Sequence, residues 1–120
     1  MGYRSEVKSL VYGEPAEMAK FMADNAELVD AVREDFGSSL DTYHKSKQTL
    51  LYLDMPYVKW YDDDAGVIRW HNLLSLANEA ELMTEFVRIG EDSEGDIEQE
   101  YSQIECEYYL EVVTAIKANF

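Results

Sequence analysis

The spacing of apolar residues changes several times along this chain, and these changes limit the folds that it can adopt. In residues 6–12 apolar side chains alternate, so that Val7 and Val11 point one way and Leu10 and Tyr12 point the other. This pattern is typical of a strand that is covered on both faces. Elsewhere the apolar residues recur every third or fourth position, as they do on one side of a helix.

Two segments have the helical spacing. The first covers residues 15–35, where Pro15 suits the first turn and Gly37 is a suitable C-terminal cap. The second covers residues 65–81 and follows three consecutive aspartates at 62–64, any of which can cap its N-terminus. We therefore expect two helices in this chain.

The other apolar segments are interpreted as strands. Pro56 removes one hydrogen-bond donor, which predicts either an edge strand or a strand bent at a bulge. The predicted strands are residues 48–61, 86–89, 96–101 and 104–116, with a polar loop over residues 38–47. The order β-α-β-α-β-β, with room for one extra strand, predicts a single α+β domain over residues 1–120, in which two helices cover one face of a mostly antiparallel sheet.

The last predicted strand, residues 104–116, has two different faces. Leu110 and Ile116 belong to its apolar face, whereas Glu105 and Glu107 lie on the opposite, acidic face. A strand with this alternation packs one face on a core and exposes the other to solvent.

The chain is strongly acidic, with 25 acidic residues, 10 basic residues and a formal net charge of −15. This charge disfavours direct binding to nucleic acid or to anionic membranes, and it favours attraction to a basic protein surface. No apolar run is long enough to span a bilayer, and the first twelve residues lack the apolar core of a signal peptide. Together with a single cysteine, Cys106, this predicts a cytoplasmic protein.

The sequence contains no motif that predicts catalysis, a metal site or a cofactor. The acidic run at 91–96 does not match the ligand spacing of a calcium-binding EF-hand loop. His44, His71 and Cys106 lack the close spacing of zinc ligands. Carboxylates next to Cys106 disfavour its thiolate, so that this residue is interpreted as part of the core. We expect a binding protein and not an enzyme, with no metal and no cofactor.

Acidic residues are most concentrated in the last third of the chain. Between positions 91 and 111 there is no basic residue, and the nine carboxylates are Glu91, Asp92, Glu94, Asp96, Glu98, Glu100, Glu105, Glu107 and Glu111. Residues two apart on a strand are roughly 6.5–7 Å apart, a spacing comparable with that of successive phosphates along a nucleic-acid strand. These residues are the predicted partner-binding site, where they could imitate nucleic acid; alternatively, their charge only protects an exposed strand from aggregation.

A second hypothesis uses the few cations together with aromatic side chains. A pocket with aromatic walls and cations could hold a nucleotide-like ligand by stacking and by paired arginine hydrogen bonds. The predicted ligand-binding residues are Arg4, Lys59, Trp60, Tyr61 and Arg88. The competing interpretation is that an arginine on a strand of such an acidic chain neutralises a nearby carboxylate. A structural or assembly role, including a homodimer joined through an edge strand, is a third alternative.

Three blocks of sequence resemble a family of short phage-encoded accessory proteins of unassigned function. They are GYRSEV at 2–7, KWYD at 59–62 and EFVRIGED at 85–92. The resemblance implies a viral protein that acts in the bacterial host cytoplasm, and it brings no catalytic residues. With the charge, it leads us to expect a protein that docks on and inhibits a host protein, such as a host-defence or nucleic-acid-processing factor.

Overall fold

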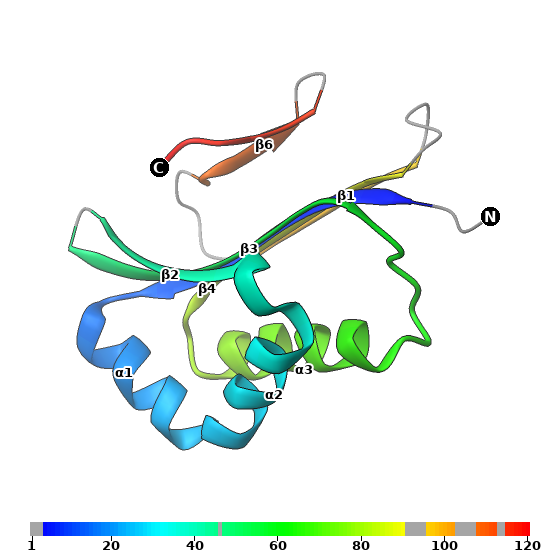
Figure 1. Cartoon of the computed structure of the whole chain (residues 1–120). Helices are drawn as coiled ribbons and strands as arrows, with labels where there is room; N and C mark the ends of the chain where they lie inside the picture. Colours follow the sequence, from blue (N-terminus) through cyan, green and yellow to red (C-terminus); the bar gives the residue numbers. More distant parts are fainter. Residues whose placement is uncertain (1–3, 46, 91–95, 103–107, 113–114) are drawn as a thin grey trace.

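The computed structural model describes residues 4–45, 47–90, 96–102, 108–112 and 115–120. Its elements are β1 (Ser5–Gly13), α1 (Pro15–Asp24), α2 (Ala26–Phe36), a 3-10 turn η1 (Gly37–Ser39), β2 (Leu40–Lys45), β3 (Gln48–Val58), α3 (Ala65–Glu79), β4 (Met83–Gly90), β5 (Ile97–Tyr101), β6 (Leu110–Val112) and β7 (Ile116–Ala118). The helices lie on one side of the main sheet, and β6 and β7 lie on the other (Figure 1).

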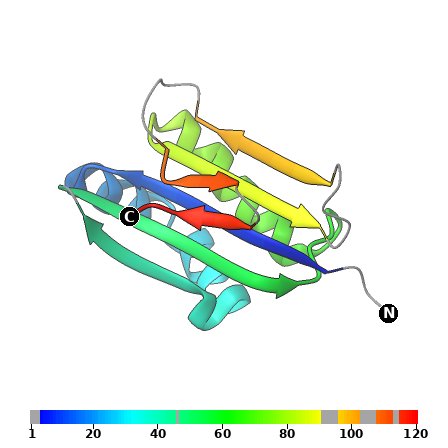
Figure 2. The same ribbon diagram turned by 90° about the horizontal axis from the view of Figure 1, so that it is seen from above.

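The main sheet has five strands in the order β2-β3-β1-β4-β5, and all neighbouring strands are antiparallel (Figure 2). This confirms the predicted α+β class, the antiparallel sheet and the placement of the helices on one face. The first four strands and their helical connections have the order of a ferredoxin-like, split β-α-β arrangement. Strand β5 extends this sheet at the β4 edge.

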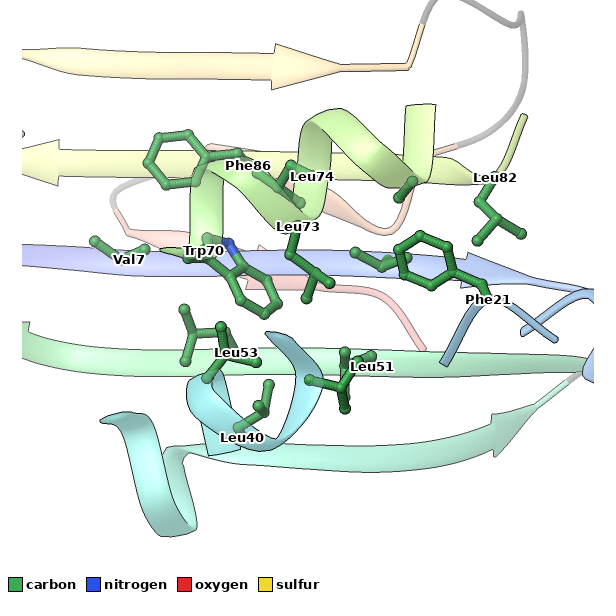
Figure 3. Packing of buried hydrophobic residues seen from close by; sticks show 14 of the residues in the cluster. Val7, Phe21, Leu40, Leu51, Leu53, Trp70, Leu73, Leu74, Leu82 and Phe86 are labelled. Atoms are coloured by element: carbon green, nitrogen blue, oxygen red, sulfur yellow. The ribbon is translucent and has the colours of Figure 1, made fainter. Parts of the chain in front are cut away.

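Strand β1 is central and contributes to a core on each face of the sheet. Val7 and Val11 belong to the helix-side core, and Leu10 and Tyr12 belong to the core under the β6–β7 hairpin. The predicted strand covered on both faces is therefore confirmed. Figure 3 shows the helix-side core, in which Trp70 of α3 lies among apolar side chains of the sheet and helices.

The single helix predicted over residues 15–35 is wrong, because the chain has two helices separated at Asn25. The backbone of Asn25 leaves the helical region, with φ of −120° and ψ of 32°. Its side-chain amide donates a hydrogen bond to the carbonyl oxygen of Phe21 at 2.9 Å. Asparagine often interrupts helices in this way, because its side chain competes for backbone hydrogen bonds.

The polar loop predicted over residues 38–47 is also wrong, since residues 40–45 form the edge strand β2. Only Leu40 of this strand is buried, and the next five residues are exposed. Pairing with β3 holds the strand through backbone hydrogen bonds, from Leu40 opposite Leu53 to Lys45 opposite Gln48. An edge strand with solvent on most sides needs little apolar sequence, so its composition resembles that of a loop.

Two predictions about the middle of the chain are refined. Strand β3 continues through Pro56 and ends at Val58, and its register with β1 shifts between Ser5 and Val7. The bulge alternative is confirmed and the edge alternative is wrong, because β3 lies between two strands. Capping by the aspartate run is confirmed, since Asp64 accepts a hydrogen bond from the backbone N–H of Gly66 at 2.9 Å.

The long strand predicted over residues 104–116 is wrong in the part that is described. Leu110 and Ile116 are both buried, but they belong to two short antiparallel strands, β6 and β7, that lie over the sheet (Figure 2). The fully buried carboxylate of Glu85 on β4 accepts hydrogen bonds from the backbone N–H groups of Tyr109 and Leu110, at 3.0 and 2.8 Å. The predicted apolar residues are thus buried, although the chain reverses between them.

Candidate functional site

Four of the nine carboxylates predicted to bind a partner are described. Asp96 directly precedes β5, Glu98 and Glu100 lie on β5, and Glu111 lies on β6. The other five fall outside the described residues: Glu91, Asp92, Glu94, Glu105 and Glu107. The described part of the predicted acidic face is therefore β5 with the residue before it, and β6.

Two of these carboxylates bind Arg88 of the neighbouring strand β4. The Arg88 guanidinium lies 2.6 Å from Asp96 and 2.7 Å from Glu98, and it also donates a hydrogen bond to the Ser5 hydroxyl at 3.0 Å. Burial alone would lower the pKa of Arg88, but the hydrogen bonds to Asp96 and Glu98 outweigh it and raise that pKa. Arg88 thus neutralises nearby carboxylates, in agreement with the structural interpretation of this residue.

Glu100 and Glu111 lie on different layers of the molecule. Glu100 is directly opposite Phe86, a residue of the helix-side core, so its side chain points to the helix side of the sheet. Glu111 belongs to the hairpin on the other side, where its carboxylate lies 3.9 Å from the Lys117 ammonium. The four described carboxylates therefore do not form one row, although Glu98 and Glu100 project from the same face of β5, opposite Arg88 and Phe86.

Glu100 lines an acidic hollow that the sequence did not predict. The hollow has a volume of about 870 Å³ and lies where the end of α3, the turn into β4 and the end of β5 meet. Its lining includes two further exposed carboxylates, Glu79 and Glu81. None of the described residues that line it is basic; the others are Asn78, Leu82, Tyr101 and Ser102. We call this feature the acidic hollow.

Hydrogen bonds hold the walls of the acidic hollow in place. The Thr84 hydroxyl donates to the side-chain oxygen of Asn78 at 2.9 Å, and the Ser102 hydroxyl donates to the Thr84 carbonyl at 2.9 Å. Tyr101 stacks on Tyr108 with ring centroids 4.3 Å apart. Burial, and after it the negative charge of the nearby Glu85 carboxylate, raises the pKa of Tyr101. The bonds through Thr84 thus connect the end of α3 with Ser102, whereas the Tyr101 ring and the Glu85 carboxylate lie on the hairpin side of the sheet.

Glu81 has an unusual backbone conformation for a residue with a side chain. Its φ of 63° is in the left-handed region, and it is one of two non-glycine residues with positive φ among the described residues. The position follows the cap of α3, where glycine is usual because a Cβ atom is unfavourable there. Non-glycine residues in this conformation are often found at functional sites. Glu81 stands directly after the C-terminal cap of a helix, where glycine is usual. This exception is the sequence signal that could have identified Glu81 as a candidate site residue.

The residues predicted for a nucleotide-like ligand are distributed over several places. Lys59 and Trp60 line a smaller hollow of about 360 Å³, but Arg4, Tyr61 and Arg88 are not among its described lining residues. Arg4 lies over the Tyr57 ring, 5.3 Å from its centroid.

Trp60 itself is largely a core residue. Its side chain packs between Phe36 and Phe86, with ring centroids 6.0 and 5.8 Å away. The structure therefore does not gather the five predicted residues around one pocket.

The residues that were considered as metal ligands or nucleophiles are separated. His44 bonds to the Thr49 hydroxyl at 3.1 Å, whereas the ring of His71 packs on Phe86 with centroids 4.8 Å apart. Cys106 lies outside the described residues. Within the described ranges, no three His, Cys, Asp or Glu side chains are arranged so that they could hold a metal ion.

Two findings concern the chain as a whole. Among the described residues, no helix has both the length and the apolar character that a membrane crossing requires. No family model, curated protein or solved structure matches the chain.

Proposed function

We propose that this protein is an acidic binding protein that docks the acidic hollow on a basic surface of a partner protein. The observation that supports this proposal is the hollow itself, where Glu79, Glu81 and Glu100 come together in a concave surface of about 870 Å³ with no basic residue in its described lining. Carboxylates in a concave surface reinforce one another, because the low-dielectric walls focus their field. A lysine or arginine side chain is the complementary group.

Two further features favour a cation at this position. The negative end of the α3 dipole is close, because Glu79 is the last residue of that helix. Position 81 also carries a glutamate, although its positive φ is unfavourable for a residue with a side chain. Both features increase the negative potential of the hollow at some expense of stability, as is common at binding sites.

A basic protein fits the hollow better than a nucleic acid does. Phosphates would be repelled by the three carboxylates, and affinity for nucleic acid derives mainly from lysine and arginine. A protein that covers the basic surface of its partner would compete with acidic ligands of that partner, nucleic acid included. This is the route by which docking would inhibit a host nucleic-acid-processing or host-defence protein.

The proposal is tested by mapping a model ligand on the surface by NMR. We expect a short peptide of alternating lysine and arginine to shift the backbone amide signals of residues 78–82 and 100–102. A peptide of the same length with glutamine at every position serves as the control and should leave those signals in place. The shifts should weaken as salt is added, because ionic strength screens exposed charges.

The distribution of the shifts decides the outcome. The exposed carboxylates Glu34, Asp62 and Asp63 lie near the end of α2 and just before α3, whereas the acidic hollow lies at the far end of α3. If the basic peptide shifts signals near these residues as strongly as those of the hollow, it binds to the net charge alone and the proposal is wrong.

A further inference from the structure

The outer edge of β2 is open to pairing with another strand. β2 is the last strand on its side of the sheet, and no described strand pairs with its outer edge (Figure 2). All side chains from Asp41 to Lys45 are exposed. The backbone N–H and C=O groups on an open edge can pair with a strand of another molecule.

The two edges of the sheet differ in charge. At the β5 edge, the three carboxylates of Asp96, Glu98 and Glu100 exceed the single positive charge of Arg88. The remaining negative charge would repel a second copy of this chain, which has a net charge of −15. Strand β2 carries one acidic residue, Asp41, and one lysine, Lys45, so its own charges cancel. The β2 edge is therefore the side at which two copies can approach with the least repulsion.

The sequence of β2 is complementary to itself. In a symmetric antiparallel pair the two-fold axis is perpendicular to the sheet, so equivalent faces of the two copies lie on the same side. With the axis at Tyr43, Asp41 of each copy is directly opposite Lys45 of the other. Opposite charges at directly opposed positions stabilise a strand pair.

The central residue of this arrangement is already positioned by its neighbours. Tyr43 is 42% exposed and contacts Tyr52 and Phe120, with ring centroids 6.0 and 5.7 Å away. At the two-fold axis, each Tyr43 ring would lie beside the ring of the other copy, between two pairs of opposite charges. On the helix side, Thr42 would lie opposite His44 of the second copy.

We propose that the protein forms a two-fold symmetric homodimer in which β2 pairs with β2 of a second copy, with Tyr43 at the axis. The two sheets would join into one continuous sheet. This inference concerns the edge opposite to the acidic hollow and does not depend on the proposed docking function. The acidic hollows would remain accessible, at the far ends of the joined sheet.

Charge reversal tests both the dimer and its register. Asp41→Lys places lysine opposite lysine, and Lys45→Asp places aspartate opposite aspartate. We expect analytical ultracentrifugation to show a concentration-dependent dimer for the wild-type chain, and a dissociation constant at least about tenfold higher for either single variant. Circular dichroism and thermal unfolding of each variant should confirm that it is folded.

Two combinations of these substitutions should restore dimerisation and so make the test specific for the proposed register. An equimolar mixture of the two single variants should form a heterodimer, because each lysine then faces an aspartate. The double variant, Asp41→Lys with Lys45→Asp, should dimerise like the wild type. A wild-type chain that stays monomeric up to millimolar concentration would overturn the proposal. So would folded single variants that dimerise as well as the wild type, or a mixture and a double variant that both stay monomeric.

Discussion

Leu82 donates its backbone N–H to the carbonyl oxygen of Ala77 at 2.9 Å and so closes the last turn of α3. The N–H of Glu81 bonds in turn to the carbonyl of Asn78 at 3.1 Å. This pair of bonds is the Schellman motif, in which the residue before Leu82 adopts a left-handed conformation. Glu81 thus combines a position that suits glycine with a carboxylate in the acidic hollow.

Replacing Glu81 by glycine should stabilise the protein. Glycine has no Cβ atom to oppose positive φ, so Glu81→Gly should raise the free energy of unfolding by about 1 kcal/mol. Urea denaturation at constant pH measures this change. Glu79→Gly is the matched control, since Glu79 is within α3 and its replacement should lower stability by up to about 1 kcal/mol. If both variants lose stability, the backbone of Glu81 is not strained.

Most of the fold follows from the spacing of apolar residues. Alternation in β1 indicated a strand with two covered faces, and the aspartate run before α3 indicated its cap. Three features could not be predicted, because the spacing of apolar residues does not mark them. Asn25 looks like a polar residue on a helix surface until its amide bonds to the backbone. Strand β2 has loop composition because it lies at an edge, and a hairpin and a long strand show the same alternation.

The acidic hollow could not be predicted from local sequence. Glu79 and Glu81 precede Glu100 by about twenty residues in the sequence. Only the pairing of β4 with β5 brings Glu100, which lies on β5, beside the end of α3. The density of acidic residues along the sequence instead predicts the partner-binding site in the run after Gly90. Within that run Asp96 and Glu98 bind Arg88, which a charge count does not reveal.

The buried carboxylate of Glu85 should be essential for the position of the β6–β7 hairpin. It accepts both the Tyr109 and the Leu110 backbone N–H. Glu85→Gln keeps one acceptor oxygen and places an amide donor against the second N–H, so it should lower the free energy of unfolding by about 1–3 kcal/mol. Glu100→Gln, at an exposed position, should change it by less than about 0.5 kcal/mol.

Hydrogen exchange locates this effect. In the Glu85→Gln variant, the backbone amides of Tyr109 and Leu110 should exchange faster than in the wild type. The amides of β1 should remain among the most slowly exchanging ones in both proteins. If Glu85→Gln is as stable as the wild type and these two amides remain protected, the carboxylate does not hold the hairpin.

The ion pair between Asp35 and Arg69 links the end of α2 to α3 and should make stability depend on pH. Arg69 donates hydrogen bonds to both Asp35 oxygens, at 2.6 and 2.7 Å. These bonds lower the pKa of Asp35 below its ordinary value of 3.8. Because the pKa of Asp35 is lowered in the folded protein, the ion pair stabilises the fold fully at pH values above the ordinary pKa. This stabilisation is lost as the pH falls through the lowered pKa of the folded state.

Comparing wild type with Asp35→Asn isolates this contribution. The wild type should be the more stable protein at neutral pH, and the difference in unfolding free energy should shrink as pH falls below 3.8. Combining Asp35→Asn with Arg69→Gln should give the same pH profile as Asp35→Asn alone, since either change removes the pair. A difference that stays constant across this range would show that the pair does not stabilise the fold.

The most direct test of the docking account compares two variants of equal charge. One carries Glu79→Gln, Glu81→Gln and Glu100→Gln, and the other carries Glu34→Gln, Asp62→Asn and Asp63→Asn. Isothermal titration calorimetry with the lysine–arginine peptide should show an affinity about tenfold lower for the first variant and nearly unchanged for the second. Equal losses in both variants would contradict the account, because the peptide would then respond to net charge and not to the acidic hollow.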